Sequence, residues 1–174
     1  RKAVVTKNWP SMVEISITEN VPSALMLKND FDGPHLYYID RKGLPFMKVE
    51  PGADLDYPVV TGISEVADEI TRETALGEVL TFLRALRSNN FHLPSQSVSE
   101  IHLEPNGEMV VYLVEYTFPI FFGNGNTRKK YSRLVYVLRD LYKKKKGQEL
   151  ISKVEFIQMK YLDDNVLVAQ SGSG

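Results

Sequence analysis

The segment of residues 153–170, KVEFIQMKYLDDNVLVAQ, constrains the fold more than any other part of the chain. It is rich in β-branched and aromatic residues, and Asp163-Asp164 interrupts it as a turn would, so it predicts two strands or one bent strand. The alternation of apolar residues slips by one position between Phe156 and Ile157, which indicates a β-bulge or a sheet covered on both faces. Only a Ser-Gly tail, residues 171–174, follows, and we therefore expect this strand to form a sheet edge, which pairs with partners unless it is protected.

Composition limits the classes of function. The chain has 174 residues, enough for one good-sized domain or a domain plus a fragment of a second. Lysine and arginine number 21 against 22 acidic residues, so a nucleic acid partner is not expected. The absence of cysteine excludes disulfides, thiolate metal sites and a cysteine nucleophile. No apolar run reaches the roughly 20 residues of a membrane span, and because the chain begins with Arg1 we expect a cut or processed piece.

Alternating apolar residues predict strands in the first third of the chain. Met12–Thr18 alternates as a half-buried strand would, after a turn at Trp9-Pro10 and a possible strand at residues 3–6. Three further short apolar runs, separated by turn residues, predict a meander: residues 24–27, 36–39 and 44–49. Residues 50–63 contain prolines and glycines and predict an irregular crossing loop.

Two amphipathic segments predict helices. The first has Thr71 or Thr74 as its cap, ends at Asn89-Asn90, and carries an apolar stripe at helical spacing: Leu76, Val79, Leu80, Leu83 and Leu86. The second has Asn126 or Thr127 as its cap, ends in the lysine run 143–146, and buries a second stripe: Tyr131, Leu134, Val135, Leu138, Leu141 and Tyr142. The lysine run is typical of a solvated helix end, although it could also meet an acidic lipid surface.

Between the helices, Pro105-Asn106-Gly107 predicts a hairpin of residues 98–103 and 109–114. Its second strand is expected to continue through Tyr116, Phe118 and Ile120. The sequence thus predicts an α+β fold, a mainly antiparallel twisted sheet with two principal helices packed on it. The aromatic residues of the C-terminal half fit either a core or an interface equally well.

None of the patterns that resemble a catalytic or cofactor site is complete. Gly123-x-Gly125 stands between a strand and a helix as a phosphate loop would, but Arg128 occupies the place of the third glycine, so a tight turn with a helix cap is favoured. Serines lack a nucleophile-elbow context, and the carboxylates before the first helix fit its N-terminus. We therefore expect no enzyme activity and no cofactor.

The possible metal ligands are similarly incomplete. His35, His92 and His102 are far apart in sequence and form no HxxxH or HExxH motif. Residues 30–33, DFDG, mimic the start of a calcium loop, but the downstream acidic ligands are absent. The sequence predicts surface histidines and a turn, and no metal site.

Motifs spread over nearly the whole chain resemble the FtsQ/DivIB family of bacterial cell-division proteins. The family has a WP turn, a strand exit, a D-x-x-G-x-x-F hairpin, an LPxLxG element, a glycine turn into a lysine-bearing helix, and a V-D-L-R-Y strand. The corresponding segments occur here in the same order: residues 4–10, 13–24, 40–46, 57–62, 123–130 and 154–161. Tyr57, Glu155 and Lys160 stand where the family commonly has Leu, Asp and Arg.

The resemblance implies a domain organisation and a role. Residues 1–22 would be the C-terminal remnant of a POTRA domain, residues 23–170 an FtsQ-type β domain, and residues 171–174 a flexible tail. Proteins of this family are single-pass inner-membrane proteins whose periplasmic part acts at the division septum as a non-enzymatic scaffold. The β domain binds FtsB and, through it, FtsL, which links the division complex to septal peptidoglycan synthesis.

The resemblance also implies where the partner binds. The partner would add a β-strand to the terminal strand, with Lys160 and Tyr161 at the partner surface. The edge itself would consist of five consecutive residues: Asn165, Val166, Leu167, Val168 and Ala169. A competing hypothesis keeps the fold but makes the protein a periplasmic POTRA-like chaperone that captures extended segments of outer-membrane proteins.

Overall fold

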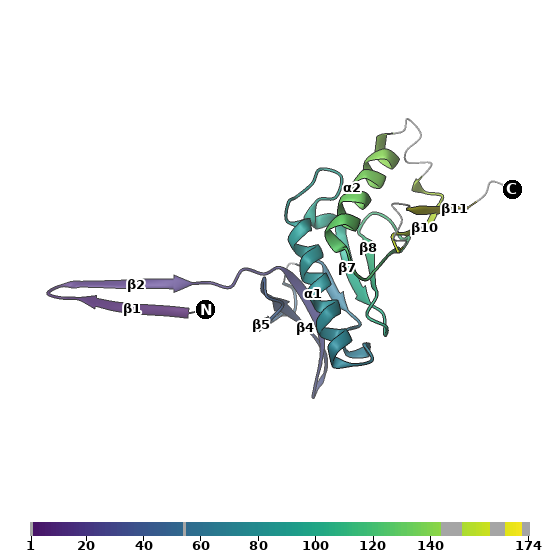
Figure 1. Ribbon diagram of the computed structural model, residues 1–174. Coiled ribbons are helices and arrows are strands. Elements are labelled where there is room, and N and C mark those ends of the chain that lie inside the picture. Colours follow the sequence, from purple (N-terminus) through teal and green to yellow (C-terminus); the bar gives the residue numbers. More distant parts are fainter. Residues whose placement is uncertain (1, 54, 144–150, 161–165, 172–174) are drawn as a thin grey trace.

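The computed structural model describes residues 2–53, 55–143, 151–160 and 166–171. It contains a nine-stranded sheet, two long helices packed against it, and an N-terminal two-stranded hairpin (Figure 1). The predicted α+β class is confirmed. Within the described residues, neither helix combines the length and the apolar content that crossing a membrane requires.

The N-terminal hairpin joins β1 (Lys2–Asn8) to β2 (Met12–Thr18) through a turn with a cis bond between Trp9 and Pro10. Both strands and the turn were predicted. Figure 1 shows the hairpin extending away from the large sheet. The predicted half-burial of β2 is wrong, because Met12 is 64% and Val13 57% exposed although their side chains point to opposite faces. No element in the described part of the chain covers either face.

Nine strands form the large sheet. They are β3 (Ala24–Asp30), β4 (Gly33–Ile39), β5 (Pro45–Lys48), β6 (Val59–Thr61), β7 (Val98–Leu103), β8 (Met109–Leu113), β9 (Ile120–Gly123), β10 (Val154–Gln158) and β11 (Leu167–Gln170). Their spatial order is β11-β10-β9-β8-β7-β6-β3-β4-β5. The predicted meander of β3, β4 and β5 and the predicted β7–β8 hairpin are confirmed as antiparallel pairs.

Two parts of the sheet differ from the expectation. The predicted crossing loop contains β6, which runs parallel to both β3 and β7 and buries Val60 completely. Strand β8 does not continue through Tyr116 and Phe118: it ends at Leu113, and β9 returns antiparallel to it. Pro119 has no N–H to continue a ladder, and its carbonyl instead accepts a hydrogen bond from the N–H of Ile157.

Both helices cover the same face of the sheet. The helices are α1 (Glu69–Leu86) and α2 (Thr127–Lys143), and two short 3-10 turns, η1 (Ile63–Glu65) and η2 (Ser95–Ser97), lie in the connections. Phe82 of α1 is completely buried, and its ring contacts Phe122 of β9 and Tyr131 of α2 at centroid distances of 5.2 and 5.7 Å. Apolar residues of both helices and of alternate strand positions belong to one hydrophobic core.

The start of α1 depends on a different residue from the one predicted. Asp68, rather than Thr71 or Thr74, is the N-cap, and its carboxylate accepts hydrogen bonds from the Thr71 N–H at 2.9 Å and the Thr71 hydroxyl at 2.7 Å. These hydrogen bonds satisfy an otherwise unpaired N–H of the first turn. They also hold the pKa of Asp68 below its usual value of 3.8.

We expect Asp68→Ala to destabilise the protein at neutral pH and to have less effect in acid. Because the folded state lowers the pKa of Asp68, the carboxylate contributes its full stabilisation above the unfolded pKa, and this contribution disappears as pH falls through the lower folded pKa. Urea unfolding of both proteins at several pH values measures the difference. A difference that stayed constant from neutral pH to about pH 2 would contradict a capping role for the ionised carboxylate.

Candidate functional site

The predicted edge strand lies at the end of the sheet. Strand β11 pairs antiparallel with β10, whose other side pairs parallel with β9 (Figure 1). The β10–β11 register shifts between Val154 and Phe156, so a bulge, one of the two predicted explanations, is present just before the predicted slip. The predicted turn at Asp163-Asp164 lies outside the described residues.

The hydrogen-bonding pattern shows which main-chain groups of β11 have no strand partner among the described residues. The Ile157 N–H donates to Pro119 O, toward β9, so this residue does not bond to β11. Val168 is directly opposite Ile157 and is therefore in a non-hydrogen-bonded pair. The N–H and C=O of Val168 consequently point away from β10, to the open edge, and those of Gln170 do the same because the pattern alternates.

The neighbouring positions confirm this alternation. The Ser171 N–H donates to Lys153 O at 2.9 Å, on the inner side of the strand. Ala169 and Leu167 therefore direct their main-chain groups inward, where they face Phe156 and Gln158. The open edge of β11 therefore presents N–H and C=O groups at every second residue, Val168 and Gln170.

The side chains of this edge divide between the two sheet faces. Val166 and Val168 are partly buried against the core, on the helix-covered face. Leu167 is 48% exposed on the other face. On that face the rings of Phe121 and Phe156 lie edge to face, with centroids 5.8 Å apart. The edge is therefore continuous with partly exposed apolar and aromatic surface.

The remaining predicted residues do not all join this edge. Lys160 follows β10, but its ammonium pairs with Glu108 in the β7–β8 turn. The two residues lie beside a hollow of about 390 Å³ that Phe121 and Gly123 also line. Tyr161 and Asn165 lie outside the described residues.

Sequence reasoning missed two residues at this end of the molecule. Gln170 was omitted from the edge, although a period of two from Val166 and Val168 would have included it. The role of Glu108 as the ion-pair partner of Lys160 has no local signal, because 52 positions separate the two residues along the chain.

The glycine turn before α2 is occupied by a lysine of the same chain. Lys130 is only 5% exposed, and its ammonium donates to the carbonyl oxygens of Phe122 at 2.9 Å and Asn124 at 2.8 Å. Burial lowers the pKa of Lys130. The loop therefore directs acceptors toward a cation instead of N–H donors toward a phosphate, which agrees with a structural turn.

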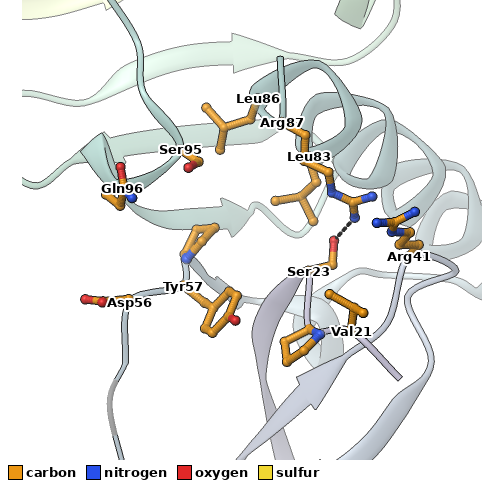
Figure 2. A pocket seen from close by; sticks show the side chains of 12 residues that line it. Val21, Ser23, Arg41, Asp56, Tyr57, Leu83, Leu86, Arg87, Ser95 and Gln96 are labelled. Carbon is orange, nitrogen blue, oxygen red and sulfur yellow. Dashed lines mark hydrogen bonds between the residues drawn. The ribbon is translucent and has the colours of Figure 1, made fainter. Parts of the chain in front are cut away.

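A second hollow lies at the beginning of β3, far from β11 in the strand order. It has a volume of about 340 Å³ and lies between the segment leading into β3, the segment leading into β6, and the end of α1. Figure 2 shows the guanidinium groups of Arg41 and Arg87 on one side of this pocket and Tyr57 projecting toward its middle. Arg87 donates a hydrogen bond to the Ser23 hydroxyl.

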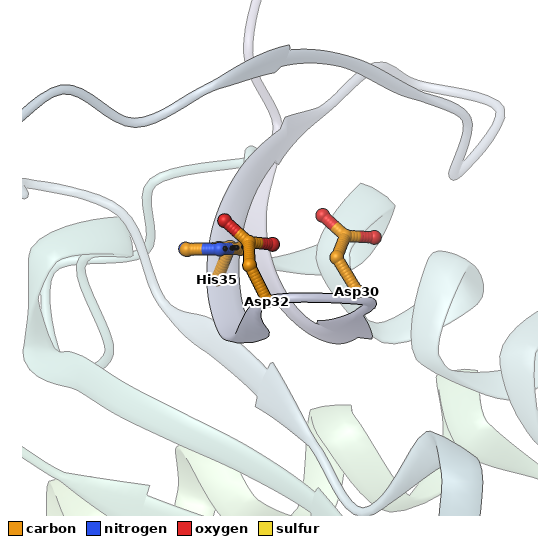
Figure 3. A group of neighbouring side chains, drawn as sticks. All are labelled: Asp30, Asp32 and His35. Carbon is orange, nitrogen blue, oxygen red and sulfur yellow. Dashed lines mark ion pairs between the residues drawn. The ribbon is translucent and has the colours of Figure 1, made fainter.

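The β3–β4 turn brings together three possible metal ligands. Donor atoms of Asp30, Asp32 and His35 lie within 4.8 Å of one another (Figure 3). The Tyr37 hydroxyl, with Lys28, holds the pKa of Asp30 low, and His35 does the same for Asp32. Lys28, 3.4 Å from Asp30, and Lys48, 4.0 Å from Asp32, offset the negative charge that would attract a cation. The three side chains thus belong to a turn in which His35 lies 2.9 Å from Asp32 and Tyr37 donates a hydrogen bond to Asp30.

Comparison with known proteins identifies relatives of one kind. A family model described as FtsQ/DivIB, C-terminal related, matches residues 31–168. Proteins named cell division protein FtsQ are 32% identical in Geotalea daltonii over 91% of the chain, 30% in Myxococcus fulvus over 87%, and 34% in Anaeromyxobacter sp. (strain K) over 80%. The chain covers 54%, 51% and 46% of these relatives, so it spans about half of their length.

Proposed function

Since the chain belongs to the FtsQ/DivIB family, we propose that it is a non-enzymatic scaffold of the division complex that receives a partner strand on β11. The partner is FtsB, and FtsL joins through FtsB, so that the scaffold connects other division proteins to septal peptidoglycan synthesis. The full-length protein is held in the inner membrane, and this part lies in the periplasm at the septum. Residues 1–22 belong to a POTRA domain and residues 23–170 to the β domain.

The observation that carries this proposal is the set of main-chain groups along β11 that no described residue pairs with. Val168 and Gln170 direct N–H and C=O groups away from the sheet, and a strand laid beside β11 would satisfy them. The opposite edge is less suited to strand addition, because β5 begins with Pro45 and ends with Lys48. Proline and lysine are typical protections of an edge against pairing.

Side chains would add selectivity to this main-chain pairing. Alternate residues of the incoming strand would lie beside the exposed side chain of Leu167, on the face that Phe156 and Phe121 continue across β10 and β9, so apolar or aromatic partner residues fit there. To pair with an acidic partner residue, Lys160 would have to contact Glu108 and that residue together, or to leave Glu108. Tyr161 and Asn165 remain predicted partner residues.

Calorimetric titration of this chain with competing peptides tests the proposal. The probes are a peptide from the C-terminal region of the cognate FtsB, a scrambled version of it, and a C-terminal strand peptide of an outer-membrane protein. The scaffold proposal predicts saturable binding of the FtsB peptide alone. Equal binding of all three would support the chaperone hypothesis instead, and no binding of the FtsB peptide to the folded chain would contradict the assignment of this partner.

A further inference from the structure

The pocket at the start of β3 contains two arginines without an acidic partner. In the described part of the chain, no carboxylate lies within ion-pair distance of the guanidinium of Arg41 or Arg87. Asp56 lines the same pocket, but Figure 2 places it on the side opposite the two arginines. The arginines therefore leave several guanidinium N–H donors directed at solvent or at a ligand.

The position of Arg87 concentrates this positive charge. Burial lowers the pKa of Arg87, and repulsion from Arg41 and Arg84 lowers it further. Arg87 also immediately follows α1, where the helix dipole and the bond to Ser23 favour a cation at this place. The two guanidinium groups repel each other, and an anion between them would relieve this repulsion.

The rest of the pocket is a suitable wall for an organic anion. Pro58 is buried, Leu83 and Leu86 are each 2% exposed, and the Tyr57 ring projects toward the middle. A volume of about 340 Å³ lies at the small end of the range for ligand sites. The pocket thus combines apolar lining residues with two guanidinium groups on one side. This lining suits a carboxylate attached to an apolar group better than a fully hydrated inorganic anion.

We propose that this pocket binds a carboxylate carried next to apolar groups, either an acidic side chain of an extended peptide or a small free carboxylic acid. The carboxylate would bridge Arg41 and Arg87, and the adjoining apolar part would lie against Tyr57 and Leu83. Four strands lie between β11 and β6 in the sheet, so this site is separate from the proposed strand-addition edge. Failure of one assignment would leave the other standing.

Amide chemical-shift titrations of the chain test this site. The probes are acetyl-Leu-Glu-Leu-amide, its Gln counterpart, glutarate and inorganic phosphate. We expect saturable shifts confined to the pocket segments, with the Glu peptide or glutarate at least about tenfold tighter than the Gln peptide and phosphate. If the Glu peptide binds more tightly than glutarate, the ligand is a peptide. If glutarate binds as tightly as the Glu peptide, the ligand is a free acid.

Two variants and a matched control complete the test. Arg87→Ala and Arg41→Ala should each weaken binding at least about tenfold. The control is Arg84→Ala, which removes the same charge from α1 but lies outside the pocket lining. It should change the affinity about twofold or less. Arg41→Ala removes no hydrogen bond or ion pair of the described structure, so the folded chain can be titrated. Three results would overturn the proposal. They are the absence of saturable shifts, binding of the Gln peptide or phosphate as tight as that of the Glu peptide, and unchanged binding by both pocket variants.

Discussion

We expect Val168→Pro to weaken binding of the FtsB peptide by about 100-fold or more while the chain remains folded. Proline removes the outward N–H of Val168, and its ring occupies the place that the incoming strand must approach. The N–H that is lost makes no bond to β10, so the sheet itself keeps its hydrogen bonds. Calorimetry with the FtsB peptide measures the affinity, and urea unfolding measures the stability.

Two matched variants separate this effect from simple damage to the edge. Val168→Ala loses the same partly buried side chain but keeps the N–H, so its affinity should stay within a few-fold of the parent. Ala169→Pro removes an inward N–H facing β10, and it should cost roughly 1–3 kcal/mol of unfolding free energy. If Val168→Ala and Val168→Pro weakened binding equally, main-chain pairing at this position would be refuted.

Phe82→Ala is expected to lower the free energy of unfolding by about 3–5 kcal/mol. Its ring is completely buried and joins α1 to β9 and α2 through Phe122 and Tyr131. Removing it takes away apolar burial and leaves a cavity where the three elements meet. Because the stability of a typical domain is about 5–15 kcal/mol, urea unfolding should show a large decrease in the midpoint concentration.

Phe31→Ala provides the matched control for this prediction. Phe31 lies at the β3–β4 turn and is fully exposed, so the same chemical change should alter stability by about 0.5 kcal/mol or less. Similar losses for Phe31→Ala and Phe82→Ala would show that the helices do not share the core described here.

Much of the fold was predictable because it depends on local signals. The helices have apolar stripes at helical spacing, and the β7–β8 hairpin has the turn sequence Pro105-Asn106-Gly107. Strand β6 was missed because it has only three residues, and pairing with β3 and β7, far away in sequence, holds it in place. The Asp68 cap was missed because the threonines that follow it are also accepted cap residues, and the sequence does not specify where the first turn begins.

The candidate site was predictable in position and less so in detail. The apolar run of residues 166–169 after the predicted Asp163-Asp164 turn indicated a strand at the sheet edge, and β11 has that position. Which main-chain groups are free depends on the pairing of β10 with β9, which no pattern within β11 specifies. The ion pair of Lys160 with Glu108 and the meeting of Arg41 with Arg87 depend on contacts between distant segments, so they required the three-dimensional structure.

Amide hydrogen exchange along β11, measured with and without the FtsB peptide, tests strand addition most directly. We predict that bound peptide slows exchange most at Val168 and Gln170, whose N–H groups face the open edge, and less at Leu167 and Ala169, which already face β10. Unchanged exchange at the outward positions under saturating peptide, or protection confined to another edge such as β5, would contradict strand addition at β11.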